Sequence, residues 1–160
     1  MLKNEPFRKL PAAYIPRPKF DHHPPILRFG FAIPNHVNEF RRVALKYRLG
    51  DPEKLNTARS GDLLRELVTT HLNERCGIQP KEGVVCEGIH SKESDLVLEI
   101  ATNYRMQIPG DKIDEMLASI REVFSLPDDV TPKWYLEFFV LEKDADAFRL
   151  PSESHISKMK

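Results

Sequence analysis

Prolines are gathered at the start of this chain, and they restrict its folding more than any other feature. Six of the 13 prolines lie within residues 1–25. Each proline fixes φ, removes a backbone donor and pushes the preceding residue toward extended geometry. A regular helix is therefore excluded in this segment. We predict an extended arm over residues 1–25, one folded domain over 26–142 and a flexible tail over 143–160.

The composition is that of a single globular domain. Hydrophobic residues make up 41% and charged residues 30% of the 160 residues, which is enough for one core. Lys plus Arg equals Asp plus Glu at 24 each, so the net charge of zero gives no global attraction to nucleic acid or to an anionic membrane. No apolar run approaches the length of a secretory signal or a membrane span. We expect a cytoplasmic protein with no membrane partner, and nuclear access stays open.

Hydrophobic periodicity predicts four strands and three helices within the domain. The predicted strands cover 26–31, 84–89, 95–106 and 133–141, and the predicted helices begin near Asn35, at Ser60 and at Asp111, each of which can cap its first turn. Residues 50–59 show no period and are expected to form a loop.

The order of these elements, β-α-α-β-β-α-β, is typical of a ferredoxin-like sandwich. This is an α+β fold in which an antiparallel sheet carries its helices on one face and leaves the other face free. An open meander packed with three helices is the alternative.

The sequence contains no signature of a metal, nucleotide or covalent-catalysis site. The six histidines and two cysteines never adopt the spacing of zinc ligands. The seven glycines form neither a phosphate-binding loop nor a nucleophile elbow. We therefore expect no metal and no cofactor, and the sequence favours a function without catalysis.

Polar side chains near the hairpin between the two middle strands support the alternative of an enzyme. The catalytic candidates are His90, Glu99 and Tyr104, with Glu87 and Asp95 close to them in the sequence. A histidine and a carboxylate at a sheet edge could act as a base and its orienting group. Such a protein would be a cofactor-independent enzyme or a small-molecule-binding protein with a cleft on the sheet. Hairpin connections are, however, also polar simply because water covers them.

The last predicted strand is apolar on both faces, which indicates an interface. Tyr135, Phe139 and Leu141 alternate with the residues expected to face the helices, and Val97 and Ala101 could extend their row. An exposed apolar sheet face usually marks an interface, most simply that of a symmetric dimer. Burial of this face by the arm or the tail has equal weight. Our main expectation is a protein-interaction or oligomerisation module that binds a second copy or another protein.

RNA binding is a third and disfavoured function. A ferredoxin-like sheet is the scaffold of RNA-recognition modules, and the basic, aromatic arm could follow a phosphate backbone. The third predicted strand, however, carries Asp95 and Glu99 where such modules have basic and aromatic residues. Nucleic acid is therefore not an expected partner.

The stretch from Phe29 to Leu136 resembles small uncharacterised proteins that are common in mushroom-forming fungi. The similarity lies in the Phe-Gly-Phe opening at residues 29–31 and the Pro-Lys-Trp-Tyr-Leu close at residues 132–136. This resemblance implies no activity and assigns no functional residues.

Overall fold

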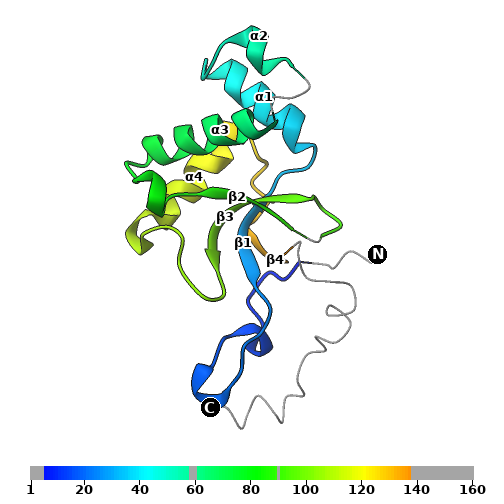
Figure 1. Cartoon of the computed structure of the whole chain (residues 1–160), viewed down its shortest axis with the longest axis vertical. Coiled ribbons are helices and arrows are strands. Elements are labelled where there is room, and N and C mark those ends of the chain that lie inside the picture. Colours follow the sequence, from blue (N-terminus) through cyan, green and yellow to red (C-terminus); the bar gives the residue numbers. More distant parts are fainter. Residues whose placement is uncertain (1–5, 58–60, 90, 138–160) are drawn as a thin grey trace.

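The described part of the chain contains four strands and four α-helices (Figure 1). The computed structural model describes residues 6–57, 61–89 and 91–137. The elements are β1 (Leu27–Ala32), α1 (His36–Lys46), α2 (Pro52–Leu55), α3 (Gly61–Arg75), β2 (Val85–Gly88), β3 (Leu96–Thr102), α4 (Ile113–Phe124) and β4 (Lys133–Leu136). Four single 3-10 turns accompany them: η1 (Ala12–Tyr14), η2 (Pro18–Phe20), η3 (Pro80–Glu82) and η4 (Gly110–Lys112).

The strands form one antiparallel sheet in the order β2-β3-β1-β4. Phe31 on β1 lies opposite Leu98 on β3, and Phe29 lies opposite Trp134 on β4. The aromatic rings of Phe29 and Trp134 also contact each other, with centroids 5.0 Å apart. The predicted fold class, α+β with an antiparallel sheet, is confirmed.

The helices cover one face of this sheet and enclose the main core with it. α1 contributes Phe40, α3 contributes Leu72 and α4 contributes Ile120, and all three pack in one cluster with Phe31 and Leu98 of the sheet. Burying one such side chain stabilises the fold by about 1.5–3 kcal/mol. No helix among the described residues is long and apolar enough to cross a lipid bilayer.

Strands β1 and β3 approach each other unusually closely at Gly30. The register shifts there, because Phe29 lies opposite Ala101 and Gly30 lies opposite Glu99. A Cβ atom on Gly30 would come within 1.8 Å of the Leu98 carbonyl oxygen. Only glycine fits at this irregularity, which bends the two central strands of the sheet.

The two ends of the sheet meet over its second face. An isolated antiparallel bridge joins Ile89, just beyond β2, to Glu137, just beyond β4, although these two strands lie at opposite ends of the sheet order. Ile89, Val97 and Tyr135 form a small buried cluster on this face, with Ala32 packed against it. The sheet therefore encloses a second, smaller interior instead of a free flat surface.

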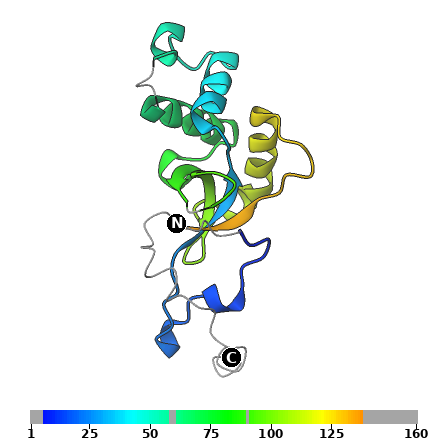
Figure 2. The same ribbon diagram turned by 90° about the vertical axis from the view of Figure 1, so that its right-hand side faces the viewer.

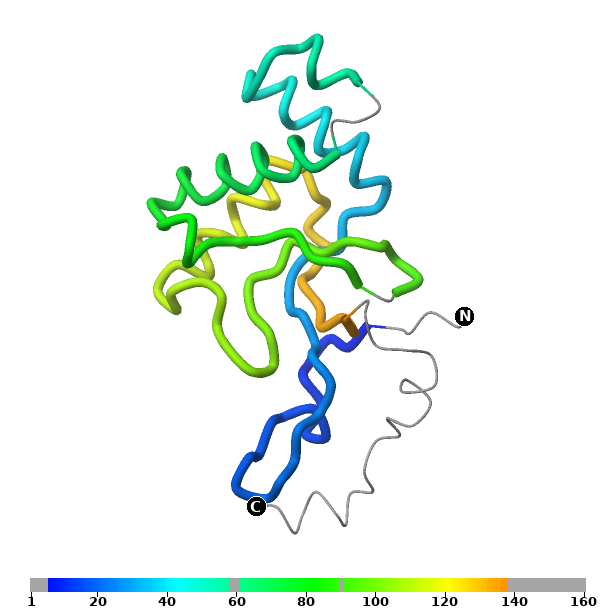
Figure 3. Tube along the Cα trace, viewed as in Figure 1, coloured from blue at the N-terminus to red at the C-terminus, as the bar shows by residue number. Residues whose placement is uncertain are grey.

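The described part of the N-terminal arm, residues 6–25, projects from the body (Figure 2). Its two legs run side by side away from the sheet, opposite the end of the molecule that carries α2 (Figures 2 and 3). Phe7 and Trp134 exchange backbone hydrogen bonds of 3.0 and 2.8 Å, which attach the arm to β4. The prolines do exclude a regular helix, but the arm is not extended throughout, because η1 and η2 interrupt it.

Asn103 fixes both legs of the arm. Its amide nitrogen donates to the carbonyl oxygens of Tyr14 (2.8 Å) and Pro25 (3.0 Å), and its side-chain oxygen accepts from the Leu27 N–H (2.9 Å). The neighbouring Tyr104 hydroxyl donates to the Pro24 carbonyl. Three bonds from one side chain therefore hold the outgoing and returning legs together.

Four local predictions are wrong. Asn35 precedes α1 in the left-handed conformation, and its side chain makes no capping hydrogen bond to the first turn. The predicted loop at 50–59 contains α2, because Asp51 caps the helix through the Glu53 N–H (3.1 Å) and Pro52 fits its first turn. β3 ends at Thr102, whose hydroxyl accepts from two following N–H groups and starts a turn. Asp111 does not cap α4, since it lies inside η4 and α4 begins after it.

Candidate functional site

Three polar side chains meet where β4 begins. The Lys133 ammonium and the Tyr135 hydroxyl both donate to the carboxylate of Glu93, one to each oxygen, at 2.5 and 2.6 Å. Residues 133 and 135 lie on the same face of β4 because side chains alternate along a strand. Glu93 comes from the loop before β3, where its N–H donates to the Ser91 hydroxyl (3.1 Å).

These three side chains line a cavity of about 480 Å³. Its other walls come from the end of β1 and from the loop between α4 and β4, namely Ala32, Pro34, Leu126, Asp129, Val130 and Thr131. The volume lies within the range of pockets for small molecules, about 300–1,000 Å³. The cavity thus combines an apolar wall with a few fixed polar groups, which is the usual composition of a ligand pocket.

A second cavity of about 350 Å³ adjoins the first and shares Pro34 and Glu93 with it. Its walls are mostly polar and include the start of α1 and the loop that precedes β3. Glu93 therefore stands between an apolar compartment and a polar compartment.

The ionisation of this group is set by its neighbours. Burial alone would raise the pKa of the Glu93 carboxyl, but the hydrogen bonds from Lys133 and Tyr135, together with the Lys133 charge, hold the pKa below its ordinary value. Burial and the Glu93 carboxylate raise the pKa of Tyr135 far above its ordinary value. Tyr135 is therefore a fixed hydrogen-bond donor and Glu93 a fixed anion at neutral pH.

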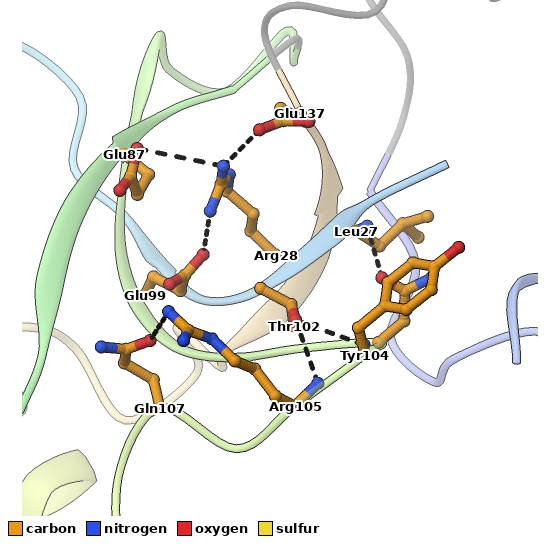
Figure 4. Close-up of polar contacts among 10 residues, drawn as sticks. Leu27, Arg28, Glu87, Glu99, Thr102, Tyr104, Arg105, Gln107 and Glu137 are labelled. Carbon is orange, nitrogen blue, oxygen red and sulfur yellow. Dashed lines mark hydrogen bonds and ion pairs between the residues drawn. The ribbon is translucent and has the colours of Figure 1, made fainter. Parts of the chain in front are cut away.

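A second polar cluster lies on the same inward face of the sheet. Arg28 of β1 pairs with Glu99 of β3 and with Glu137 beyond β4, and its guanidinium lies 3.9 Å from the carboxylate of Glu87 on β2. Figure 4 shows Arg28 reaching between the strands toward these three carboxylates. One cation of β1 thus meets carboxylates from β2, from β3 and from the residue that follows β4.

Glu99 is the most buried member of this cluster, with 2% of its side chain exposed. Burial raises the pKa of its carboxyl, and the hydrogen bond and charge of Arg28 oppose that rise only in part. The cluster is structural, because the two terminal guanidinium nitrogens of Arg28 already bind the carboxylates of Glu99 and Glu137.

The predicted catalytic residues are not assembled into one site. Glu99 binds Arg28, whereas Tyr104 lies in the turn after β3 and binds the arm, with 46% of the residue exposed. Asp95 lines the polar cavity. His90 lies outside the described residues.

The three predicted interface residues that the structure describes lie inside the chain. Val97, Ala101 and Tyr135 are all buried, the first and last of them in the small cluster of the inward face. Phe139 and Leu141 lie outside the described residues.

The sequence reasoning missed Arg28, Glu93, Lys133 and Glu137. A usable signal existed for two of them, because Arg28 and Glu137 are single charges within otherwise apolar strands, as is Glu99. Isolated charges of opposite sign in apolar strands indicate paired burial. No such signal existed for Glu93 and Lys133, which lie 40 residues apart in loop or strand-end positions.

Neither metal ligation nor similarity to known proteins adds to this picture. Across the described ranges, no three His, Cys, Asp or Glu side chains are grouped so that they could hold a metal ion. No family model, no curated protein and no solved structure matches this chain. The resemblance to fungal proteins stays a prediction.

Proposed function

We propose that this chain is a small-molecule-binding protein whose ligand occupies the 480 Å³ cavity beside Tyr135. The observation that carries the proposal is the convergence of Glu93, Lys133 and Tyr135 on one wall of an otherwise largely apolar cavity. The two bonds to Glu93 preset the positions of these groups, so little ordering is needed when a ligand binds.

A steric block of the cavity tests the proposal. Thr131 lines the cavity and is exposed, so Thr131→Trp should fill the space and leave the core intact. The probe is N-phenyl-1-naphthylamine, a neutral dye that fluoresces in apolar surroundings. We expect saturable binding to the unchanged chain and at least tenfold weaker binding to Thr131→Trp.

The matched control is Thr70→Trp, which places the same side chain at an exposed position of α3 away from the cavity. This variant should bind the dye as the unchanged chain does, and both variants should give the same far-ultraviolet circular dichroism. Absence of saturable binding, or equal binding by the two variants, would contradict the proposal.

An interaction role is a second proposal, and the arm is the observation that favours it. The arm exposes Phe20 (48%) and Ile15 (38%), and the loop that clamps it exposes Tyr104 and Met106. These are four of the seven large hydrophobic side chains exposed in the described part of the chain. Ordered exposed apolar groups of this kind are frequent in protein interfaces.

Light scattering after size exclusion tests self-association through the arm. We expect a dimer at high concentration that Phe20→Ser converts to a monomer, whereas Leu63→Ser, at a similarly exposed position of α3, leaves the dimer unchanged. If the chain is a monomer at every concentration, the proposal of self-association is wrong.

For the finer architecture, we propose a ferredoxin-like sandwich elaborated by α2. The chain contains two β-α-β units, one ending in β2 and one ending in β4. These units interleave in the sheet, since β3 lies between β1 and β2, and β1 lies between β3 and β4. An experimental structure would test it, and parallel pairing of any two of these strands would contradict it.

A further inference from the structure

We infer that the ligand of the 480 Å³ cavity is an amphipathic amine, with its apolar part against Leu126 and Val130 and its ammonium group at Asp129. The inference rests on the proposed function, which it extends to the chemical class of the ligand. Leu126 and Val130 are partly buried and pack against the main core, so they form a firm apolar wall.

The charged side chains around the cavity differ in whether they can still bind a charged ligand. Glu93, Asp129 and Lys133 are its three charged lining residues. Lys133 already donates one of its three N–H groups to Glu93, whose carboxylate offsets most of the ammonium charge, so an anionic head group gains little net attraction there. An anionic head group would also lie beside the Glu93 carboxylate and repel it.

Asp129 is the group left to meet a charged ligand. It lies on a turn closed by the hydrogen bond from the Val130 N–H to the Pro127 carbonyl oxygen (3.0 Å), which fixes this part of the wall. Within the described part of the chain, no hydrogen bond or ion pair engages its carboxylate. An ammonium is the complement that gains charge attraction there.

Three ligands that share an eight-carbon chain and differ in their head groups test this inference: octylamine, octanol and octanoate. They are titrated by calorimetry at pH 7, where the head groups are cationic, neutral and anionic. The net charge of the chain is zero, so no bulk attraction favours one of them. We expect octylamine to bind about fivefold more tightly than octanol, as for a partly exposed ion pair, and octanoate to bind most weakly.

Two isosteric variants locate the effect. Asp129→Asn should reduce octylamine to the affinity of octanol and leave octanol unchanged. Asp128→Asn removes the same charge one residue away, outside the cavity lining, and should keep the preference for octylamine. Equal affinities of the three compounds, or tighter octanoate, would overturn the inference while the proposed function stands. If none of them binds and the neutral dye also fails, both proposals are wrong.

Discussion

Replacing Arg28 with methionine should destabilise the fold strongly, because Arg28 forms the ion pair with the buried carboxylate of Glu99. Glu99 is 2% exposed and would lose its ion pair, while Glu137 and Glu87 would remain near it. Removing one partner of a buried pair costs about 3–5 kcal/mol, and the more exposed carboxylates add about 1 kcal/mol at most. For a chain of this length, a loss of about 3 kcal/mol lowers Tm by about 10 °C.

Urea unfolding followed by Trp134 fluorescence measures this loss, and two further variants test its cause. The double variant Arg28→Met/Glu99→Met should recover most of the stability, because the buried Glu99 charge is removed with its partner and the remaining carboxylates of Glu137 and Glu87 are more exposed. Arg42→Met removes an exposed pair with Glu39 and a hydrogen bond to the Phe124 carbonyl oxygen, and should change the free energy of unfolding by only about 1–2 kcal/mol. The reasoning is refuted if Arg28→Met costs no more than Arg42→Met, or if the double variant is no more stable than the single one.

The pH dependence of Arg28→Met gives an independent check. Burial raises the pKa of Glu99 even in the unchanged chain, and loss of Arg28 removes the interactions that oppose this rise. A carboxyl whose pKa is higher in the folded state binds protons preferentially there, so stability falls as pH rises from the ordinary value of 4.5 through the raised one. Arg28→Met should therefore lose stability over this window more steeply than the unchanged chain.

Three further predictions concern backbone fit, the arm and the thiols. Gly30→Ala should lower stability by about 1–3 kcal/mol because of the clash with Leu98, whereas Gly110→Ala, with open space around it, should not; equal thermal denaturation of the two would contradict this. Asn103→Ala should release the arm and speed its cleavage by trypsin at least tenfold, and unchanged cleavage would show that the clamp is dispensable. Burial raises the pKa of Cys86 to about 12, so Ellman's reagent should label it slowly at pH 8 until urea is added, and rapid labelling of the native chain would count against this.

The spacing of apolar residues predicted much of the fold, because the residues that a helix or strand buries recur at a fixed period within a short stretch of sequence. On α3, apolar residues at helical spacing include Leu64, Val68 and Leu72, and all three are buried. Leu63 stands in the same apolar run but is exposed, since apolar content alone does not fix the angular limit of a buried helix face. The irregularity at Gly30 had no local signal, because the close approach depends on the backbone of β3.

The candidate site could not be predicted because its contacts are non-local. The inward turn of the sheet depends on a bridge between Ile89 and Glu137, and periodicity within one strand carries no information about a bridge between the two outer strands. The two-sided apolar character of β4 was a correct observation with an incomplete explanation. Tyr135 is covered within the chain, and its hydroxyl reaches Glu93 at the cavity.

Glu93→Gln should show how much the charge of Glu93 at the cavity contributes to stability, independently of the Arg28 cluster. The pKa of Glu93 is held below 4.5 in the folded state, so the stability that its charge provides is fully present above that value and is lost as pH falls through the lowered pKa. Because the side chain is about a third exposed, the expected advantage over Glu93→Gln at pH 7 is only about 1 kcal/mol. Urea titrations of both chains between pH 3 and 7 should show this difference shrinking with acidification. A difference that stays constant or grows toward low pH would mean that Lys133 and Tyr135 do not bind Glu93 as an anion.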